Sequence, residues 1–303
     1  GGVSHIDTFD PKDNKWAGFS SAAAAWRVSN EAFMKDLKVI NDLKLRLSYG
    51  QTGNQGIGSY ASLAKLSVYN YVFGGAVQTG LANDLYSGPP NEKLKWETTT
   101  SYNAGLDLSM FNKRFNLQVD LYKKITDDLL QNLIIPSSTG FPTKLVNSGS
   151  IENKGLEVTL GGVVLKNKDF EWNSSFNIAF NRNKILSLSP DVTEQYGRNI
   201  STGDAPFIQT VGKPIGALYG YVEDGYYDNE AEVRSDPAYS GQGSAIILRT
   251  IGEIKYKNLD NDRTNISQTD RTFIGNVNPD YTFGFTNNFR YKRFDLSVFI
   301  NGV

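Results

Sequence analysis

Oxygen-bearing side chains at alternate positions are the first feature of this sequence that could support chemistry. Asn258, Asp260 and Asp262 occupy every second position, and Asp270 follows further along the chain. Alternate oxygen ligands allow one short loop to wrap around a hard cation such as Ca²⁺. Arg263 stands where such a loop has glycine, however, and Asp270 lies one residue beyond the position of the closing ligand. The pattern leaves two interpretations open, a calcium site formed by these four side chains or a polar surface loop.

Aromatic side chains in or beside the expected loops form a second set of candidates. Tyr and Trp rings combine a large contact area with one hydrogen-bonding edge, so they can stack on sugar rings or pack against a peptide. The same residue types also form girdles at membrane interfaces. The candidates for substrate contact are Trp96, Tyr219, Tyr221, Tyr226 and Tyr227.

The sequence offers little evidence for an enzyme that breaks covalent bonds. Carboxylates occur as close pairs, such as Asp127 with Asp128, but hydrolysis needs two carboxylates that face each other across the bond at a fixed separation. The chain has no Gly-x-Ser-x-Gly elbow, no phosphate-binding Gly-Lys-Ser/Thr loop and no Cys, and His5 is its single histidine. The absence of Cys excludes thiol chemistry, and a single histidine excludes a multi-histidine metal site within this chain. We therefore expect no enzyme, and a secreted glycan-active β-sandwich is the weakest alternative.

Composition favours a β protein and argues against a nucleic-acid partner. The 303 residues carry 31 Lys and Arg against 32 Asp and Glu, which argues against a nucleic-acid partner because duplex binding needs a dense basic face. Aromatic residues reach 12% and glycine numbers 29, a balance typical of strands and turns. The longest apolar run has only five residues, at 22–26, which excludes a membrane-spanning helix. Strands of a membrane β-barrel alternate in polarity, so hydropathy does not exclude them.

Period-two alternation of apolar and polar residues is the strongest structural signal. Leu43, Leu45 and Leu47 alternate with Lys44 and Arg46, for example, which predicts a strand with one apolar and one polar face. The same pattern recurs along the chain and predicts eight or nine antiparallel strands. They are one ending near Phe9 and others at 20–28, 42–52, 98–110, 115–122, 156–164, 170–181, 281–291 and 294–300.

Short and long connections alternate strictly between these strands. Tight hairpins are expected at 111–114, 166–169 and 292–293. Long connections occupy 53–97, 127–149 and roughly 183–279. A soluble antiparallel sandwich also has strands with one polar face, but long loops on one side and short turns on the other are typical of an outer-membrane barrel.

One helix is expected, at Asn30–Ile40, with Asn30 as its N-cap and an apolar spacing near 3.6 residues. The alternation of connections assigns it to the side of the short turns, which in such a barrel is the periplasmic side.

Several segments together resemble one family. The strand Leu43–Gln55 has the sequence LKLRLSYGQTGNQ, and it is followed by KWETTT at 95–100 and NSGSIENKGLE at 147–157. These three segments are similar to the SusC/RagA family of TonB-dependent outer-membrane transporters of Bacteroidetes. Further similar segments follow in the same order at 212–221, 252–257 and 274–285. The loop at 258–270 also resembles the calcium-type sequence that many members carry there.

The resemblance implies a fold and a function. It implies that residues 1–303 are part of an antiparallel transmembrane β-barrel of about 22 strands with long extracellular loops, without the plug domain and the terminal strand. It also implies active import of a glycan or an oligopeptide across the outer membrane of a Gram-negative bacterium, with a SusD-like surface lipoprotein, TonB and outer-membrane lipids as partners. The alternative is a surface structural or adhesion β protein without transport. No cofactor is expected apart from the calcium considered above.

Overall fold

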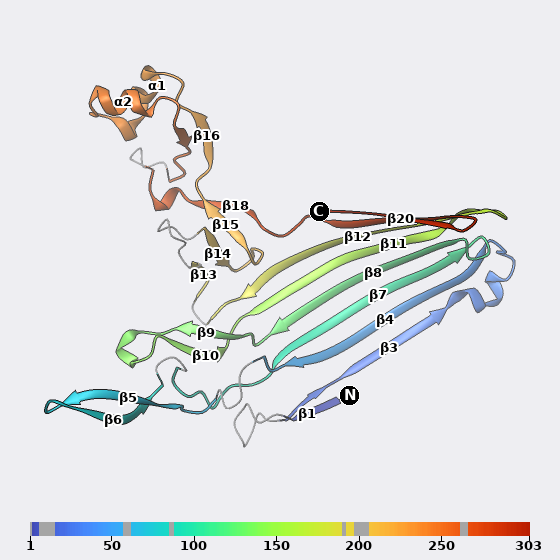
Figure 1. Ribbon diagram of the computed structural model, residues 1–303, viewed down its shortest axis with the longest axis horizontal. Coiled ribbons are helices and arrows are strands. Elements are labelled where there is room, and N and C mark those ends of the chain that lie inside the picture. Colours follow the sequence, from blue (N-terminus) through green and yellow to red (C-terminus); the bar gives the residue numbers. More distant parts are fainter. Residues whose placement is uncertain are drawn as a thin grey trace. The chain divides into compact units, whose positions relative to one another are not determined.

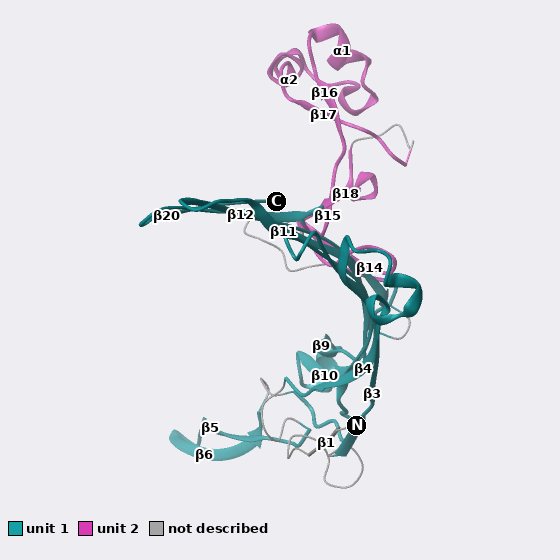
Figure 2. Cartoon of the chain, turned by 90° about the vertical axis from the view of Figure 1, so that its right-hand side faces the viewer, with its two compact units in different colours: residues 1–193, 279–303 teal, residues 194–278 magenta. Residues whose placement is uncertain are grey.

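The computed structural model describes residues 2–5, 16–56, 62–84, 88–189, 192–196, 206–260 and 266–303. The chain divides into two compact units, one formed by residues 1–193 with 279–303 and the other by residues 194–278 (Figure 2). The first unit is built on one large sheet, and the second on short strands and helices.

The large sheet has eight antiparallel strands and is curved (Figures 1 and 2). Its members confirm the expected strands, and several of them are longer than the sequence pattern indicated. β11 and β12 reach 17 and 18 residues, against the 9–11 needed to cross a bilayer. In spatial order the strands are β20 (Phe294–Gly302), β19 (Thr282–Tyr291), β12 (Phe170–Ser187), β11 (Ser150–Lys166), β8 (Phe115–Asp127), β7 (Glu97–Met110), β4 (Ile40–Asn54) and β3 (Ser21–Arg27).

Of the region before Phe9, where a strand is expected, the structure describes only residues 2–5. Phe9 itself lies outside the described residues, and β1 (Gly2–His5) pairs only with β2 (Trp16–Phe19) in a separate two-stranded sheet.

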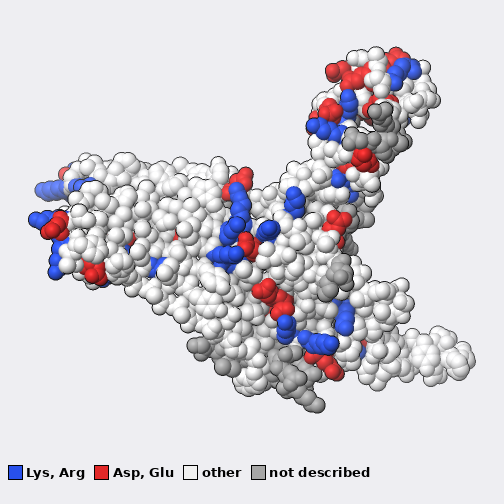
Figure 3. Space-filling model, turned by 180° about the vertical axis from the view of Figure 1, so that it is seen from behind, with Lys and Arg blue, Asp and Glu red and all other residues white. Residues whose placement is uncertain are grey.

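The two faces of the sheet differ in polarity because the strands are in register. Cross-strand partners bring apolar side chains of successive strands into one row, such as Leu45, Leu106, Val119, Val158, Ile178 and Phe283. Seen from behind, the convex side of the sheet has a broad area almost without charged side chains, with charge at its two ends (Figure 3). The opposite face carries the polar set that alternates with these residues.

A polar pair lies within the apolar face. The indole Nε1 of Trp172 donates a hydrogen bond to Oδ1 of Asn287 at 2.9 Å, and Asn287 is only 7% exposed. Trp172 also stacks on Phe289, with ring centroids 5.5 Å apart. The amide thus satisfies the one polar atom of the indole on a mostly apolar face.

Tight turns join the strands at one end, as expected. Between β7 and β8 the residues Phe111, Asn112 and Lys113 have φ of 54°, 56° and 64°. Between β11 and β12 the side-chain oxygen of Asn167 accepts hydrogen bonds from the backbone amides of Asp169 and Phe170 at 3.1 and 2.8 Å. These compact turns fix the register of the strands that they join.

The long connections contain hairpins that the sequence analysis did not identify. β5 (Leu66–Phe73) and β6 (Ala76–Asn83) pair across Gly74 and Gly75, whose φ of 61° and 80° suit a two-residue hairpin turn. β9 (Leu130–Ile134) and β10 (Thr143–Asn147) pair around the 3₁₀ turn η3 (Ser137–Thr139).

The helix expected at Asn30–Ile40 is not formed. Its place is taken by two 3₁₀ turns, η1 (Val28–Asn30) and η2 (Ala32–Met34), in the connection between β3 and β4 at the tight-turn end. Glu31 between them has an extended backbone, and its carboxylate accepts a hydrogen bond from Trp26 Nε1 at 2.9 Å. Phe33 and Leu37 are 66% and 50% exposed, so no packing partner stabilises an amphipathic helix here.

The second unit consists of short elements. β13 (Glu194–Tyr196), β14 (Phe207–Thr210), β15 (Ala217–Gly220) and β18 (Thr272–Asn276) form one sheet, and β16 (Glu223–Tyr226) pairs with β17 (Ile254–Tyr256). The helical elements are α1 (Glu230–Ser235), η4 (Pro237–Tyr239), α2 (Ser244–Thr250) and η5 (Gln268–Asp270). Within the described parts of the chain, no helix is long and apolar enough to cross a membrane.

Candidate functional site

The polar face of the sheet is organised around Arg46. Its Nε and Nη2 donate to the two carboxylate oxygens of Asp107 at 2.9 Å each, and Nη2 also lies 3.0 Å from Asp120 Oδ1. In the cross-strand register Gly105 stands directly between Arg46 and Asp120. A Cβ at Gly105 would lie 2.5 Å from Arg46 Nη2 and 2.7 Å from Asp120 Oδ1, so a larger residue would displace the guanidinium from its path across β7.

A second glycine allows a similar bridge one row away. Gly155 stands between Tyr122 and Asn181, and the Tyr122 hydroxyl donates to Asn181 Oδ1 at 3.0 Å. A Cβ at Gly155 would lie 2.6 Å from the ring of Tyr122 and 2.4 Å from the carbonyl oxygen of Phe180. The phenol therefore covers the bare backbone of β11 and ties three strands together.

Other polar side chains of this face also bond to one another. Thr99 and Thr126 are joined at 2.9 Å, Ser109 donates to Asn116 at 2.9 Å, and Ser297 donates to Asn288 at 2.7 Å. Because these polar groups use one another as partners, fewer of them are available to hold a passing solute. The face can therefore act as a wetted wall that binds solutes weakly.

Trp96, the first of the predicted aromatic candidates, is packed inside the first unit. It is 8% exposed, clusters with the fully buried Leu94, and meets the ring of Phe19 edge-on with centroids 5.6 Å apart. Little of its ring surface is available to a ligand, and packing accounts for its position.

Tyr227 is likewise buried, at the centre of the helical part of the second unit. It is 5% exposed and packs with Val233 and Ile247, while its hydroxyl donates to Asp236 Oδ2 at 2.6 Å. Burial and the neighbouring Asp236 carboxylate both raise the pKa of the phenol. Its neighbour Tyr226 is 55% exposed, so the chain turns the two rings to different environments.

Tyr219 and Tyr221 are brought together by a residue that the sequence analysis missed, Arg271. The guanidinium carbon lies 4.9 Å from the ring centroid of Tyr219 and 5.9 Å from that of Tyr221, and Nη2 donates to the Tyr219 carbonyl at 2.7 Å. Tyr256 adds a further ring, with its centroid 5.4 Å from that of Tyr221. We call Tyr219, Tyr221, Tyr256 and Arg271 the aromatic cluster.

The loop with the oxygen-bearing side chains is fixed by Asp270. This residue is fully buried, and its carboxylate accepts from the backbone amides of Leu259 and Ser267 at 2.7 and 2.8 Å. With Ser267 it forms a capping box at the start of η5. The carboxylate of Asp260 accepts a hydrogen bond from the Thr269 hydroxyl.

Of the four predicted calcium ligands, the structure describes three, Asn258, Asp260 and Asp270. Asp262 lies outside the described residues, and Asn258 is half-buried. Among the described residues, no group of three or more His, Cys, Asp or Glu side chains is placed to hold a metal ion. Because Asp270 is engaged by two amides, any cation at this loop would rely on Asn258, Asp260 and Asp262.

Two kinds of functional residue escaped the sequence analysis for different reasons. Gly105 faces Asp120 because the turn at 111–114 sets their register, so counting outwards from that turn could have found the pair. Arg46 joins them across a connection of more than forty residues, whose register no local signal fixes. Arg271 lies about fifty residues from the tyrosines that it contacts, and nothing in the sequence marks it.

Comparison with known proteins agrees with this architecture. The family model described as "TonB dependent receptor-like, beta-barrel" matches residues 1–218. TonB-dependent receptor P3 of Formosa agariphila is 36% identical in an alignment over 299 residues that covers 95% of this chain and 28% of the relative. TonB-dependent receptor SusC of Bacteroides thetaiotaomicron is 34% identical in an alignment over 275 residues that covers 82% of this chain and 27% of the relative.

A solved structure extends the likeness to three dimensions. The RagAB peptide importer in its closed-closed state superimposes with a TM-score of 0.78 at 26% identity, covering 99% of this chain and 30% of the solved chain. The chain thus spans less than a third of the length of each of these relatives. With its antiparallel, two-faced sheet, it belongs to the TonB dependent receptor-like β-barrel family, among the SusC and RagA type of members.

Proposed function

We propose that this chain forms part of the barrel wall and surface loops of a transporter that imports a nutrient across the outer membrane. The observation that carries the proposal is the register of the eight-stranded sheet, which collects apolar side chains on the convex face and polar side chains on the other. Such a wall can face lipid on one side and an aqueous lumen on the other. The names of its relatives, TonB-dependent receptors and a peptide importer, support the same role.

The polar face of the sheet would line the path of the solute and bind it only weakly. Arg46 is neutralised by Asp107 and Asp120, and Tyr122 is engaged by Asn181. Passage through a lumen requires that the wall hold the solute weakly enough to release it. We infer that the wall passes the solute on without modifying it, and that binding is left to the loops.

The aromatic cluster is the best-formed candidate for binding among the predicted residues. Tyr219 and Tyr221 are half-buried, which holds their rings in place, and Tyr226 nearby in sequence is exposed. Rings held in this way can stack on a sugar or pack against a peptide at low entropic cost. The substrate class is therefore a glycan or an oligopeptide.

Partner proteins supply the energy for import and help to capture the substrate in this proposal. We infer that TonB drives the import step through parts of the polypeptide other than residues 1–303. We also infer that a SusD-like surface lipoprotein captures the substrate with it. The relatives named SusC and RagAB support both partners.

The test is uptake by cells in which the complete transporter gene is deleted and then restored. We expect the deletion strain to lose growth on one glycan or oligopeptide, and the intact gene to restore it. Tyr221→Ala should raise the concentration that gives half-maximal uptake roughly tenfold, because each stacked ring contributes about 1–1.5 kcal/mol.

Tyr291→Ala is the matched control. This tyrosine is 52% exposed beside the tight turn of β19 and β20, far along the strands from any loop ring. Growth and uptake unchanged by the deletion on every tested glycan and peptide, with the protein present in the outer membrane, would support the surface adhesion alternative instead.

A further inference from the structure

A row of basic side chains crosses the apolar face of the sheet. The register places Lys123 of β8 opposite Lys154 of β11, and Lys154 opposite Arg182 of β12. Tyr102 of β7 and Tyr49 of β4 continue the row on the other side. These side chains lie on the same face as Leu121 and Leu156, because each stands two residues from them along its strand.

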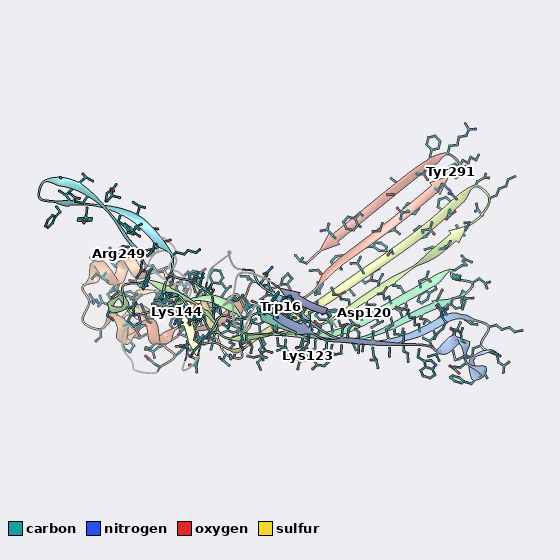
Figure 4. All side chains as sticks on the ribbon, turned by 90° about the horizontal axis from the view of Figure 1, so that it is seen from below. Trp16, Asp120, Lys123, Lys144, Arg249 and Tyr291 are labelled. Atoms are coloured by element: carbon teal, nitrogen blue, oxygen red, sulfur yellow. The ribbon has the colours of Figure 1, made fainter. Side chains whose placement is uncertain are left out.

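Figure 4 separates this row from the polar wall. Lys123 and Asp120 project from opposite faces of the sheet, as their spacing of three residues on one strand requires. In Figure 3 a band that contains Lys and Arg borders the uncharged area of the convex side away from the tight turns.

The positive charges of this row are incompletely neutralised. Glu152, whose side chain is only 12% exposed, lies 2.9 Å from Lys123 Nζ but 3.6 Å from Lys154 Nζ. Arg182 is held by Asp280 at 2.8 Å, and Lys184 stands opposite Glu152 in the next row. Within the row, Lys123 and Lys154 thus share the single carboxylate of Glu152.

Lys154 is the most exposed member of the row. Its side chain is 63% exposed, and it has a cation directly opposite on both neighbouring strands. Like charges in directly opposed positions destabilise a sheet. An external anion at Lys154 would relieve this repulsion.

A groove runs along the row on its apolar side. It has a volume of about 870 Å³ and lies between the basic row and the next row of the same face, where Ala104 separates Leu47 from Leu121. Leu156 and Phe180 extend its apolar border. Anion-binding and apolar surfaces therefore adjoin at the same height of the sheet.

We propose that this surface, defined by Lys123, Lys154, Arg182 and the groove beneath them, binds an anionic lipid through its phosphate headgroup. The phosphate oxygens bridge Lys154 to its basic neighbours, and the acyl chains lie along the leucines and Phe180. A lipid fits better than a free anion because charge complementarity ends where the apolar groove begins. The inference rests on the proposed function only in requiring that this face meet the membrane.

The site lies in the leaflet on the side of the long connections. Tyr102 and Met110 are eight residues apart on β7, which corresponds to roughly 26 Å of strand between the basic row and the tight-turn end. With long connections extracellular, the lipid belongs to the outer leaflet.

The test uses the complete transporter in nanodiscs of phosphatidylcholine doped with a few per cent of phosphorylated lipid A. Native mass spectrometry should detect bound lipid A, and enzymatically dephosphorylated lipid A should be retained much less. Lys154→Gln and Arg182→Gln should each weaken binding roughly fivefold, because each removes one basic side chain near a membrane surface. Glu152→Gln should strengthen it, since a competing carboxylate is lost.

Lys124→Gln is the matched control, because this lysine lies on the same strand as Lys123 but on the polar face, 5.3 Å from the ring centroid of Tyr122. Equal retention of lipid A by wild type, Lys154→Gln and Arg182→Gln would overturn the proposal. So would displacement of bound lipid A by millimolar inorganic phosphate alone, which would identify a free-anion site. Heat-modifiable migration of every variant in electrophoresis shows that the barrel is intact, and its loss in the wild type would instead count against the proposed function.

Discussion

Arg46 in the large sheet and Asp270 in the unit at 194–278 satisfy their charges in different ways. In the sheet, Arg46 reaches Asp120 across another strand, 74 residues away in sequence. In the second unit, the Asp270 carboxylate closes bonds with backbone amides only 3 and 11 residues away. The sheet therefore spreads its stability over many cross-strand rows, whereas the second unit depends on a few buried side chains. Substitutions should have larger local effects in the second unit.

The largest effect is expected at Tyr227. Tyr227→Ala removes a 5% exposed ring from the cluster with Val233 and Ile247, and should reduce the local free energy of unfolding by about 3–5 kcal/mol. Hydrogen exchange of the amides in α1 and α2 of the intact transporter measures this loss. Tyr226→Ala, at the neighbouring exposed position, should change it by less than about 0.5 kcal/mol. Equal protection in both variants would remove the contrast between the two regions.

Asp270→Ala should have the next largest effect. It leaves the amides of Leu259 and Ser267 without their acceptor and should cost about 1–3 kcal/mol. Faster exchange of these two amides, without change in the sheet, is the expected readout. Asp224→Ala is a suitable control because the Asp224 carboxylate is exposed and its ion pair with Lys257 is long, at 3.9 Å. Unchanged exchange at Leu259 would show that the loop does not depend on the carboxylate.

Within the sheet, the sign of a glycine substitution should depend on its row. Gly105→Ala places a methyl group against Arg46 and Asp120 and should destabilise the barrel by about 1–2 kcal/mol. Gly50→Ala meets only Ser21 Cβ at 3.8 Å and should be neutral or stabilise slightly, because the unfolded chain loses entropy. The temperature at which heat-modifiable migration is lost compares the two variants. A lower temperature for Gly50→Ala than for Gly105→Ala would contradict the bridging role of Gly105.

Smaller, pH-dependent effects on stability are expected in the second unit. The raised pKa of Tyr227 contributes stability to the second unit that is complete below the ordinary tyrosine pKa of about 10 and decreases as the pH rises above it. The pKa of Glu232 is lowered by its hydrogen bond from the Asp228 amide and by Lys255, so its contribution is lost as the pH falls below about 4.5. Hydrogen exchange across pH should show the alkaline loss in wild type and not in Tyr227→Phe. An alkaline loss retained in Tyr227→Phe would assign it to another group.

The smallest effect concerns calcium. We propose that the loop of Asn258, Asp260 and Asp262 binds calcium only weakly, with a dissociation constant of about 10⁻⁴–10⁻³ M, because Asp270 is already engaged. Calorimetric titration of the intact protein should give heat that Asp260→Asn abolishes. No heat up to several millimolar would leave the loop as a purely polar surface.

The same contrast explains what could be predicted from the sequence. Alternation located the eight strands of the large sheet, because each has one apolar and one polar face and a shift by one residue would invert both, but it missed the first six residues of β11 and the last six of β12. The helix at 30–40 was wrong because spacing alone does not supply a packing partner for Phe33 and Leu37. Aromatic residue type could not separate the buried Trp96 and Tyr227 from the clustered Tyr219 and Tyr221, because local sequence carries no record of what packs against each ring.

The irregular positions of the sheet have a consequence for how such a chain can diverge. Register shifts occur between Ile40 and Asp42, between Ser150 and Ile151, and between Val163 and Leu165, all within a few residues of strand ends. An odd insertion deeper in a strand would exchange lipid-facing for lumen-facing side chains over the rest of that strand. Related sequences should therefore differ in strand length by even numbers of residues and carry single-residue insertions only near strand ends. In an alignment, the positions of insertions with an odd number of residues should then mark where the strands end and the loops begin.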